Sequence, residues 1–217
     1  MCPVSPKSPP PSDLREACVL AAREIIAKRG LEGLSLREVA RELGVSHQAP
    51  YKHYASRDHL LAAVMRRCFQ DMAGYLDAGV LTADADADLR ALGERYLRYA
   101  AEHPLEYRLM FGTPWPEPAI HHDLVQDAVH ALDVLRLALH RISGQEAVNV
   151  DLDAMLIWST LHGLASITHA DVMRHLPLGN GVPAQVPAHV LDMLELALKA
   201  TGKPQEHIPM PATGSQP

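Results

Sequence analysis

The sequence lacks the features that define several large classes of protein. Its 217 residues include only three cysteines, Cys2, Cys18 and Cys68, with no Cys-x-x-Cys spacing, which argues against a disulfide framework and a thiolate metal site. No apolar run approaches the ~18 residues that a membrane span needs. Residues 1–12 lack the basic flank and apolar stretch of a secretory signal. We therefore expect a cytoplasmic protein with no membrane-spanning segment.

Motifs for catalysis and for metal binding are also absent. There is no Gly-x-Ser-x-Gly, no phosphate-binding loop and no dinucleotide fingerprint, so nothing indicates an enzyme. The 13 histidines include no His-x-x-x-His pair and no acidic or cysteine partners at a recognised spacing. We expect neither a metal ion nor a cofactor. The acidic run Asp84, Asp86 and Asp88 predicts a solvated helix start capped by Asp86 or Asp88.

Charge divides the chain into two unequal parts. Residues 1–72 hold 11 Lys and Arg against 8 Asp and Glu, whereas residues 73–217 hold 9 against 18. A basic N-terminal third joined to an acidic remainder indicates that a polyanion, if bound, is bound at the N-terminal end. Random variation of the surface is the alternative explanation.

Apolar residues recur at spacings of three and four along most of the chain, and no segment shows sustained strand alternation. The prediction is an all-α fold. A first helix runs from Leu14 to Arg29 after a cap at Ser12 or Asp13, and proline-rich tails occupy residues 1–12 and 202–217. Later helices are predicted at about 86–103, 104–111, 118–142, 150–174 and 187–200.

Residues 35–58 predict a helix-turn-helix unit. Ser35 and Glu38 form a capping box that opens a short helix, and Gly44 ends that helix in a position suited to positive φ. A third short helix covers residues 47–54, and a long helix opens at about Ser56, where Arg57 and the free N–H groups of the helix start would bind a phosphate. Two short helices around a glycine turn between longer helices are typical of this motif.

The third segment is the least apolar of these helices and carries side chains suited to DNA. Donors, acceptors and one cation on it match base edges and phosphates, while Val45 and Tyr54 are expected to anchor it to the core. Pro50 lacks the N–H that a helix interior requires, so either Ser46 caps the helix and one bond is forfeited, or the helix starts later. An ordinary helical hairpin is the alternative interpretation of the unit.

The run Leu36 to Ser46, followed by Ala49-Pro-Tyr-Lys-His-Tyr54 and Ser56-Arg-Asp-His-Leu-Leu61, resembles the DNA-binding domain of TetR/AcrR-type repressors. The resemblance implies an all-α homodimer that binds double-stranded operator DNA and has a separate C-terminal ligand domain. Many members carry glycine, threonine and leucine near Gln48, Ala49 and Pro50, so operator preference does not carry over. By position, the resemblance implies DNA contacts from Ser35, Arg37, Ser46, His47, Gln48, Tyr51, Lys52, His53 and Arg57.

A second resemblance concerns the C-terminal part. Trp158, His162 and Gly163 resemble the tryptophan-histidine-glycine motif that names one class of C-terminal domain in this family, and the run Tyr107 to Gly112 is similar to that class as well. Gly163 would let a neighbouring helix or ligand approach closely. The alternative is that Trp158 and His162 belong to the core. Arg108 would either neutralise an acidic ligand or lie exposed beside Glu106. The candidate ligand-binding residues are Tyr107, Arg108, Met110, Phe111, Trp158 and His162.

The predicted organisation is a helix-turn-helix domain over residues 13–58 and a helical ligand-binding and dimerisation domain over residues 59–201. The function it favours is a homodimeric repressor released from DNA by a small-molecule inducer. A small helical enzyme or carrier using a cavity around His162, and a DNA-binding protein without an inducer, are the alternatives. The predicted dimer interface packs the helices at about 150–174 and 187–200 against their copies, unless these faces only close the core of one chain. Its apolar residues are Leu152, Met155 and Leu156 on the first helix and the stripe Val190, Leu191, Leu194, Ala197 and Leu198 on the second.

Overall fold

The computed structural model describes residues 11–143, 150–170 and 172–201, and these residues form an all-α fold, as the sequence predicts. The predicted tails fall almost entirely outside the described residues. The helices are α1 (Pro11–Arg29), α2 (Leu36–Glu42), α3 (Arg57–Asp77), α4 (Ala85–Glu102), α5 (Pro104–Phe111), α6 (His122–Ser143), α7 (Val150–His169) and α8 (Val182–Thr201), with short 3₁₀ turns η1 (Leu31–Gly33), η2 (Pro50–Lys52) and η4 (Val172–His175).

Several predicted helix limits are wrong. α1 already includes Ser12 and Asp13, so neither residue caps it. α6 starts at His122 rather than near residue 118, and α7 ends at His169, with a 3₁₀ turn after it. α8 starts at Val182, so Pro187 lies inside the helix rather than at its start. At α4 the cap is Asp84, whose side chain accepts a hydrogen bond from the backbone N–H of Ala87.

The N-terminal module, residues 11–60, is fixed by local caps and one compact core. The Ser35 hydroxyl accepts from the Glu38 N–H, and the Ser56 hydroxyl accepts from the His59 N–H. Gly44 has φ of +64°, a conformation that glycine adopts without steric cost. The three features confirm the predicted starts of α2 and α3 and the glycine turn between them.

The predicted capping box is only half formed. The Glu38 carboxylate pairs with Arg29 of α1 at 2.7 Å and with Arg41, one turn further along α2. Because these cations compete for the carboxylate, Glu38 ties α2 to α1 instead of closing back on its own helix start.

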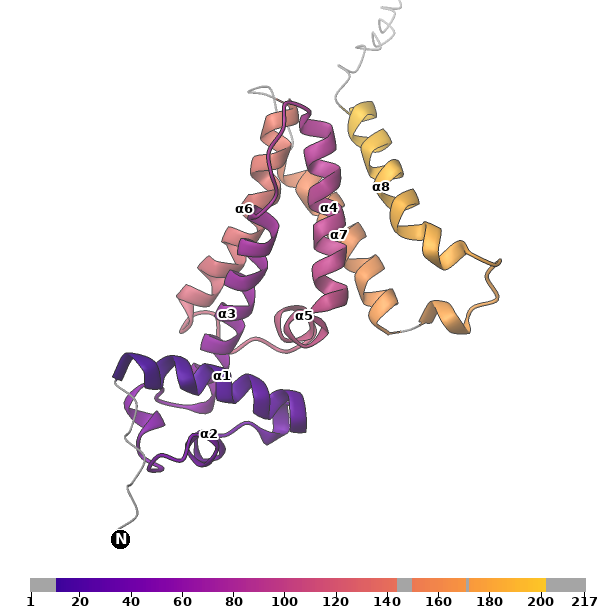
Figure 1. The fold of residues 1–217 in the computed structure, drawn as a ribbon. Coiled ribbons are helices and arrows are strands. Elements are labelled where there is room, and N and C mark those ends of the chain that lie inside the picture. The colour runs from indigo at the N-terminus through magenta and orange to yellow at the C-terminus, as the bar shows by residue number, and fades with distance from the viewer. Residues whose placement is uncertain (1–10, 144–149, 171, 202–217) are drawn as a thin grey trace, which may run out of the picture.

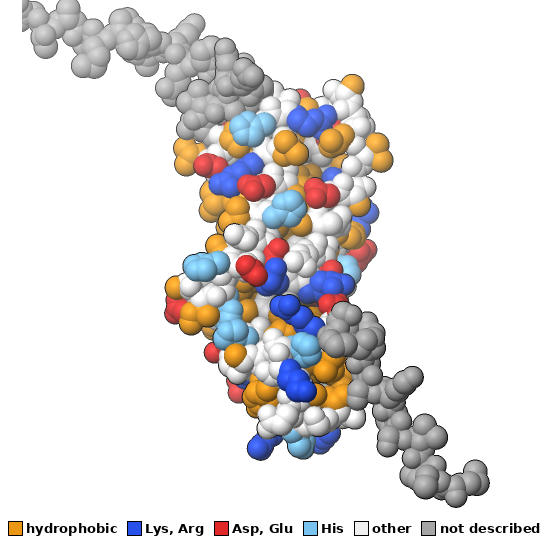
Figure 2. All heavy atoms as spheres, turned by 90° about the vertical axis from the view of Figure 1, so that its left-hand side faces the viewer, with side chains coloured by type: hydrophobic (Ala, Val, Ile, Leu, Met, Phe, Trp, Pro, Cys, Tyr) orange, Lys and Arg blue, Asp and Glu red, His pale blue; other side chains and the backbone are white. Residues whose placement is uncertain are grey.

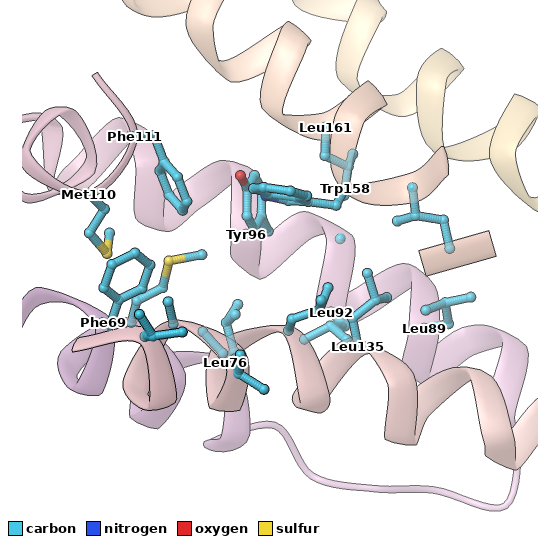
Figure 3. Close-up of a pocket in the computed structure, with 18 of the residues that line it drawn as sticks. Phe69, Leu76, Leu89, Leu92, Tyr96, Met110, Phe111, Leu135, Trp158 and Leu161 are labelled. Carbon is cyan, nitrogen blue, oxygen red and sulfur yellow. The ribbon is translucent and has the colours of Figure 1, made fainter. Parts of the chain in front are cut away.

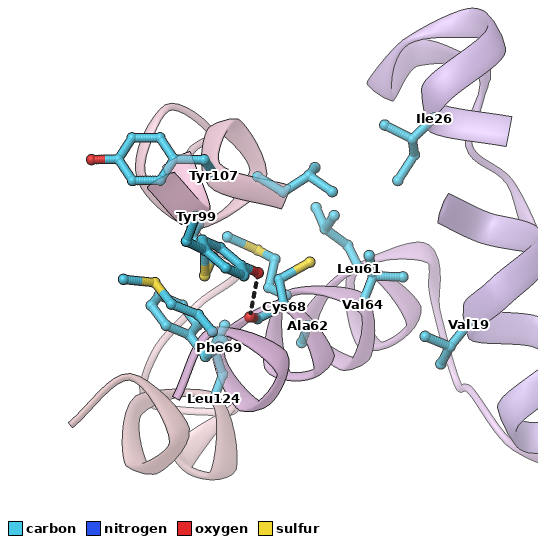
Figure 4. Packing of buried hydrophobic residues seen from close by; sticks show 14 of the residues in the cluster. Val19, Ile26, Leu61, Ala62, Val64, Cys68, Phe69, Tyr99, Tyr107 and Leu124 are labelled. Atoms are coloured by element: carbon cyan, nitrogen blue, oxygen red, sulfur yellow. Dashed lines mark hydrogen bonds between the residues drawn. The ribbon is translucent and has the colours of Figure 1, made fainter. Parts of the chain in front are cut away.

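One helix, α3, extends from the N-terminal module into the C-terminal bundle (Figure 1). Near its start it packs on α1, and further along it packs on α5 and α6. Figure 4 shows the continuous apolar core along it, where Leu61 and Val64 face α1 and the Tyr99 hydroxyl donates to the Cys68 carbonyl at 3.4 Å. α3 is therefore the structural link between the two ends of the chain.

The C-terminal bundle consists of α4 to α8 with the second half of α3. At Gly93 of α4, a Cβ atom would lie 2.6 Å from the side chain of Leu191, so the glycine permits α8 to approach α4. The turn before α4 is held by Asp88, which accepts from Arg141 of α6 at 2.6 Å and from the Thr82 N–H at 2.8 Å. Asp88 is therefore a buried structural carboxylate and not a solvated one.

Candidate DNA interface and ligand cavity

The segment expected to read DNA is a pair of tight turns and not an α-helix over residues 47–54. After the turn at residues 47–49, η2 runs only from Pro50 to Lys52. Pro50 occupies the first position of this turn, and its carbonyl accepts from the N–H groups of His53 and Tyr54. Because proline donates no backbone hydrogen bond, an α-helix that begins several residues before Pro50 would lose one of its hydrogen bonds. Neither of the two helix starts considered in the sequence is observed, because Ala49 takes the N-cap position and only a 3₁₀ turn follows it.

Side chains of this segment divide between core and solvent. Tyr54 is buried, as predicted, and its hydroxyl donates to the carbonyl of Arg15 at 3.1 Å, which anchors the segment to α1. Val45 is partly buried against the same core. By contrast, five polar or aromatic side chains are exposed on one continuous stretch: Ser46, His47, Gln48, Tyr51 and Lys52.

The remaining predicted contacts border this exposed stretch. Arg37 on α2 is exposed, whereas Ser35 and His53 are half-buried. Figure 2 shows Lys, Arg and His side chains gathered at the end of the molecule where α1 and α2 lie in Figure 1. This end therefore presents cations and hydrogen-bonding groups together, which is the combination that phosphate contact and base contact both need.

Arg57 is engaged within the chain. Its Nε donates to the Leu34 carbonyl at 3.1 Å, and its Nη2 donates to the Leu31 carbonyl at 2.8 Å. The guanidinium thus holds the η1 turn against the start of α3. Its role as a phosphate contact stays a prediction, and the geometry gives it a structural role that the sequence did not indicate.

The C-terminal bundle contains a cavity of about 440 Å³ between α3, α4, α5, α6 and α7. In Figure 3, Phe69 and Leu76 of α3 face Tyr96, Phe111 and Trp158. Volumes of this order are usual for small-molecule sites, which are mostly apolar with few polar groups. No side chain in the wall carries a formal charge.

The six predicted ligand residues do not form a single site. Met110, Phe111 and Trp158 line the 440 Å³ cavity, whereas Tyr107, Arg108 and His162 line a separate cleft of about 660 Å³ on the other side of α5. Phe111 borders both spaces. The split arises because α5 is a short helix packed between them, so that adjacent residues on it face opposite ways.

A chain of hydrogen bonds connects the two spaces. The Tyr96 and Tyr107 hydroxyl oxygens are 2.8 Å apart, and the Tyr107 hydroxyl lies 2.7 Å from His162 Nδ1. Burial raises the pKa of Tyr96 to about 12 and raises that of Tyr107 further. Burial also lowers the pKa of His162 below 6.5. At neutral pH all three groups are uncharged, so the chain carries no net charge into the cavity.

Arg108 is exposed and does not pair with Glu106, which instead binds Arg23 of α1 at 2.5 Å. Around Gly163, no described atom lies within 4 Å of the position that a Cβ would take, so within one chain this glycine does not permit a close approach. The predicted reason for the glycine is therefore not observed among the described residues of the chain.

Most residues of the cavity wall were not identified from the sequence. Phe69, Met72 and Leu76 on α3, Leu92 on α4 and Leu135 on α6 are apolar residues at helical spacing. That pattern is the same for a filled core and for a cavity wall. Among the wall residues that were missed, Trp115 alone could have been identified from the sequence, because it is an aromatic residue in a proline-rich loop after α5. Its indole N–H donates to the Met110 carbonyl at 2.8 Å.

Among the described residues, no three His, Cys, Asp or Glu side chains converge as a metal ion would require. Within the same ranges, no helix is both long and apolar enough to cross a bilayer.

An exposed polar turn between two helices, joined by one long helix to a bundle with a cavity, defines the class of helix-turn-helix regulators of transcription. Residues 19–64 match the family described as bacterial regulatory proteins, tetR family, and residues 89–194 match a tetracyclin repressor-like C-terminal domain. The two matches together span more than two thirds of the chain. The chain therefore belongs to the TetR family, whose members are transcriptional regulators and not enzymes.

Individual relatives agree with this assignment. The chain is 29% identical over 118 residues to the HTH-type transcriptional regulator Rv1816 of Mycobacterium tuberculosis, covering 53% of this chain and 50% of that protein. It is 28% identical over 140 residues to the HTH-type transcriptional activator FasR of Mycolicibacterium smegmatis, covering 64% of each. The first match thus spans half the length of the relative.

Among solved structures, the TetR family regulator PfmR of Thermus thermophilus superposes with a TM-score of 0.59 at 21% identity, covering 82% of this chain and 97% of that one. At this identity the likeness concerns the fold alone.

Proposed function

We propose that the protein is a homodimeric repressor that binds a near-palindromic DNA operator and is released by a small-molecule inducer. The observation that carries the proposal is the position of α3, which begins beside the exposed polar turn and ends in the wall of the apolar cavity. A ligand in the cavity acts on the DNA-binding end if it binds the two positions of α3 with different affinity. Because such a regulator acts on bacterial chromosomal DNA, we also propose that the protein is cytoplasmic.

For the DNA interface, we propose that the exposed turn enters the major groove and that the cations beside it contact phosphates. Gln48 and His53 are proposed base readers, while Arg37 and Lys52 are proposed phosphate contacts. The full proposed set keeps Ser35, Arg37, Ser46, His47, Gln48, Tyr51, Lys52, His53 and Arg57. The helix-turn-helix domain proper is proposed to cover residues 13–58, within the N-terminal module.

A titration of the promoter beside its own coding region, at several salt concentrations, tests this interface. Lys52→Ala should weaken all duplexes alike and reduce the slope of log affinity against log salt by about one unit. Gln48→Ala should instead cost roughly 1 to 3 kcal/mol at particular operator positions only. Absence of salt-dependent binding to that promoter would refute the proposed function.

For the dimer, we retain the expected contribution of α7 and change that of α8. Leu191 and Leu194 of the expected stripe are buried inside the chain against α4 and α7. The exposed apolar residues are Leu152, Met155, Leu156 and Ile167 on α7 and Met193 and Leu196 on α8. Ser159 and Gly163 lie between Leu156 and Ile167 at helical spacing, so the α7 stripe includes a short flat section where a second helix fits closely.

We propose that this face packs against its copy around a two-fold axis, which would set two DNA-binding turns about 34 Å apart. Leu196→Glu should yield folded monomers with operator affinity near the non-specific level, because an unpaired buried carboxylate costs several kcal/mol. Leu137→Glu is the matched control, since Leu137 on α6 is 64% exposed and Leu196 is 60% exposed. Light scattering that shows an intact Leu196→Glu dimer would contradict this face.

We propose that the protein represses transcription. The relative FasR is named an activator, so the direction of regulation needs its own test. A promoter–reporter assay in cells with and without the coding sequence separates the two directions. We also retain the tryptophan-histidine-glycine class as a proposal for the C-terminal domain. Its proposed ligand residues are Met110, Phe111 and Trp158 in the cavity and Tyr107, Arg108 and His162 in the neighbouring cleft.

A further inference from the structure

The strongest unexplained feature of the cavity is that it offers almost nothing to a charged molecule. Its wall is built from aliphatic, methionine and aromatic side chains, and no Lys, Arg, His, Asp or Glu contributes to it. An ionised carboxylate or ammonium that leaves water without a partner loses several kcal/mol. The wall therefore selects against a ligand whose charge enters the cavity.

The size of the cavity indicates the size of the ligand. An apolar cavity of ~150 Å³ accommodates one benzene ring, so about 440 Å³ is roughly three times as much. Filling it removes apolar surface of both ligand and wall from water, at roughly 25 cal/mol per Å². A ligand of many carbons gains most from this term.

The wall carries one hydroxyl, that of Tyr96. A tyrosine hydroxyl has one donor and two acceptor lone pairs. The contact with Tyr107 at 2.8 Å takes one of these three positions and the Trp158 side chain takes a second, so one remains for a ligand. Tyr107 is held in turn by His162 at 2.7 Å, so the Tyr96 oxygen has a fixed position. By contrast, the Trp115 N–H in the wall is already bound to the Met110 carbonyl.

We infer that the cavity binds an uncharged, mainly hydrocarbon molecule with one oxygen group, a carbonyl or hydroxyl, that hydrogen-bonds to the Tyr96 hydroxyl. Either oxygen group is accepted, because the direction of the Tyr96–Tyr107 bond follows the His162 tautomer. When Nδ1 carries the proton, Tyr107 donates to Tyr96 and Tyr96 donates to a carbonyl; when Nδ1 is bare, Tyr96 donates to Tyr107 and accepts from a hydroxyl. This inference rests on the proposed function for its biological meaning. The ligand is the inducer of that proposal.

Both tryptophans of the chain, Trp115 and Trp158, lie in the cavity wall. Their fluorescence therefore reports occupation of the cavity directly and independently of DNA. We choose three probes with the same carbon chain: decan-2-one, decanoate and decylammonium, titrated at pH 7.5. Decan-2-one should bind, and the two charged probes should bind at least about tenfold more weakly.

Variants locate the oxygen contact. Tyr96→Phe should weaken decan-2-one by about fivefold, the size of one net hydrogen bond. Tyr99→Phe is the matched control, because Tyr99 is a buried tyrosine of the same helix whose hydroxyl binds the Cys68 carbonyl and does not reach the cavity. Ala128→Phe fills the cavity from α6 and should abolish binding, and Ala131→Phe provides a second variant if the first does not fold.

Promoter binding measured on the same samples separates the two proposals. If decanoate binds tenfold more tightly than decan-2-one, or if Tyr96→Phe and Tyr99→Phe behave alike, the inference is wrong. The same holds if no probe changes the tryptophan fluorescence while the promoter is still bound, in which case the regulator remains and its ligand is of another class. Loss of promoter binding in the parent protein overturns the proposed function instead.

Discussion

The two ends of the molecule differ in how completely their interiors are filled. In the N-terminal module, Cys18, Ala22 and Leu60 have no exposed surface, and the polar groups face outward. In the C-terminal bundle, side chains of the same kinds surround a cavity of about 440 Å³. A tightly packed interior fixes the shape of a surface that must match DNA, whereas an incompletely filled interior leaves room for a ligand.

This difference is one of free energy as well as of shape. In a closely packed interior, adding or removing even one methylene changes the free energy of unfolding, because the neighbouring side chains have no room to relax. A cavity forfeits dispersion contacts along its wall, and that loss is recovered when a ligand binds. The C-terminal bundle is therefore the end of the molecule whose stability depends on its surroundings.

The same substitution at the two ends should change stability in opposite directions. Ala22→Leu on α1 overfills a closed core and should lower the free energy of unfolding by about 1 to 3 kcal/mol. Ala128→Leu projects into the cavity and should raise it, by up to about 1 kcal/mol. Urea unfolding measures both. A loss for Ala128→Leu as large as that for Ala22→Leu would show that the cavity is filled in solution.

Within the N-terminal module, Arg57 is hydrogen-bonded inside the chain whereas Lys52 is exposed, and substitutions of the two should affect stability differently. Arg57→Met removes the hydrogen bonds to the Leu31 and Leu34 carbonyls and should cost about 1 to 2 kcal/mol of stability. Lys52→Met is exposed and should change stability by less than about 0.5 kcal/mol. If Arg57→Met left the thermal midpoint unchanged and lowered the salt slope by one unit, the phosphate contact expected from the sequence would be correct.

Acid should loosen the C-terminal bundle at one defined carboxylate. The hydrogen bond from Arg141, with those from Thr82, holds the pKa of Asp88 below 3.8. Its stabilisation is thus complete above pH 3.8 and is lost as pH falls through the lowered pKa. Asp88→Asn should melt earlier at pH 7 and show a shallower decline below pH 4 than the parent. Asp86→Asn, an exposed neighbour, should match the parent at both ends of the titration.

Much of the fold could be predicted because caps and turns are local. Ser35, Ser56 and Gly44 act within three or four residues of their own position, and the structure confirms each of them. The family resemblance added the order of the helices. Pro187 shows where local rules fail, since packing of α8 on α4 and α7 retains a helix through a residue that normally ends one.

The site was harder to predict than the fold. Trp158 and Phe111 were identified by their motifs, but Phe69 and Leu135 look like any core residue because apolar periodicity does not record whether the space between helices is filled. On α5, Met110 lines the cavity whereas Tyr107 and Arg108 line the neighbouring cleft. Residues so close together on a short helix cannot be assigned to one space or the other from the sequence alone. Leu194 was expected at a dimer face for a related reason: periodicity identifies an apolar face and not the partner that covers it.

The cavity also makes the molecule unevenly sensitive to hydrostatic pressure. Unfolding eliminates internal void and so decreases the volume of the system, in proportion to the void that is lost. The C-terminal bundle carries that void and should open first on compression, while the closed N-terminal module keeps its shape. A molecule seated among Phe69, Tyr96 and Trp158 would occupy the same volume and make the two ends respond alike.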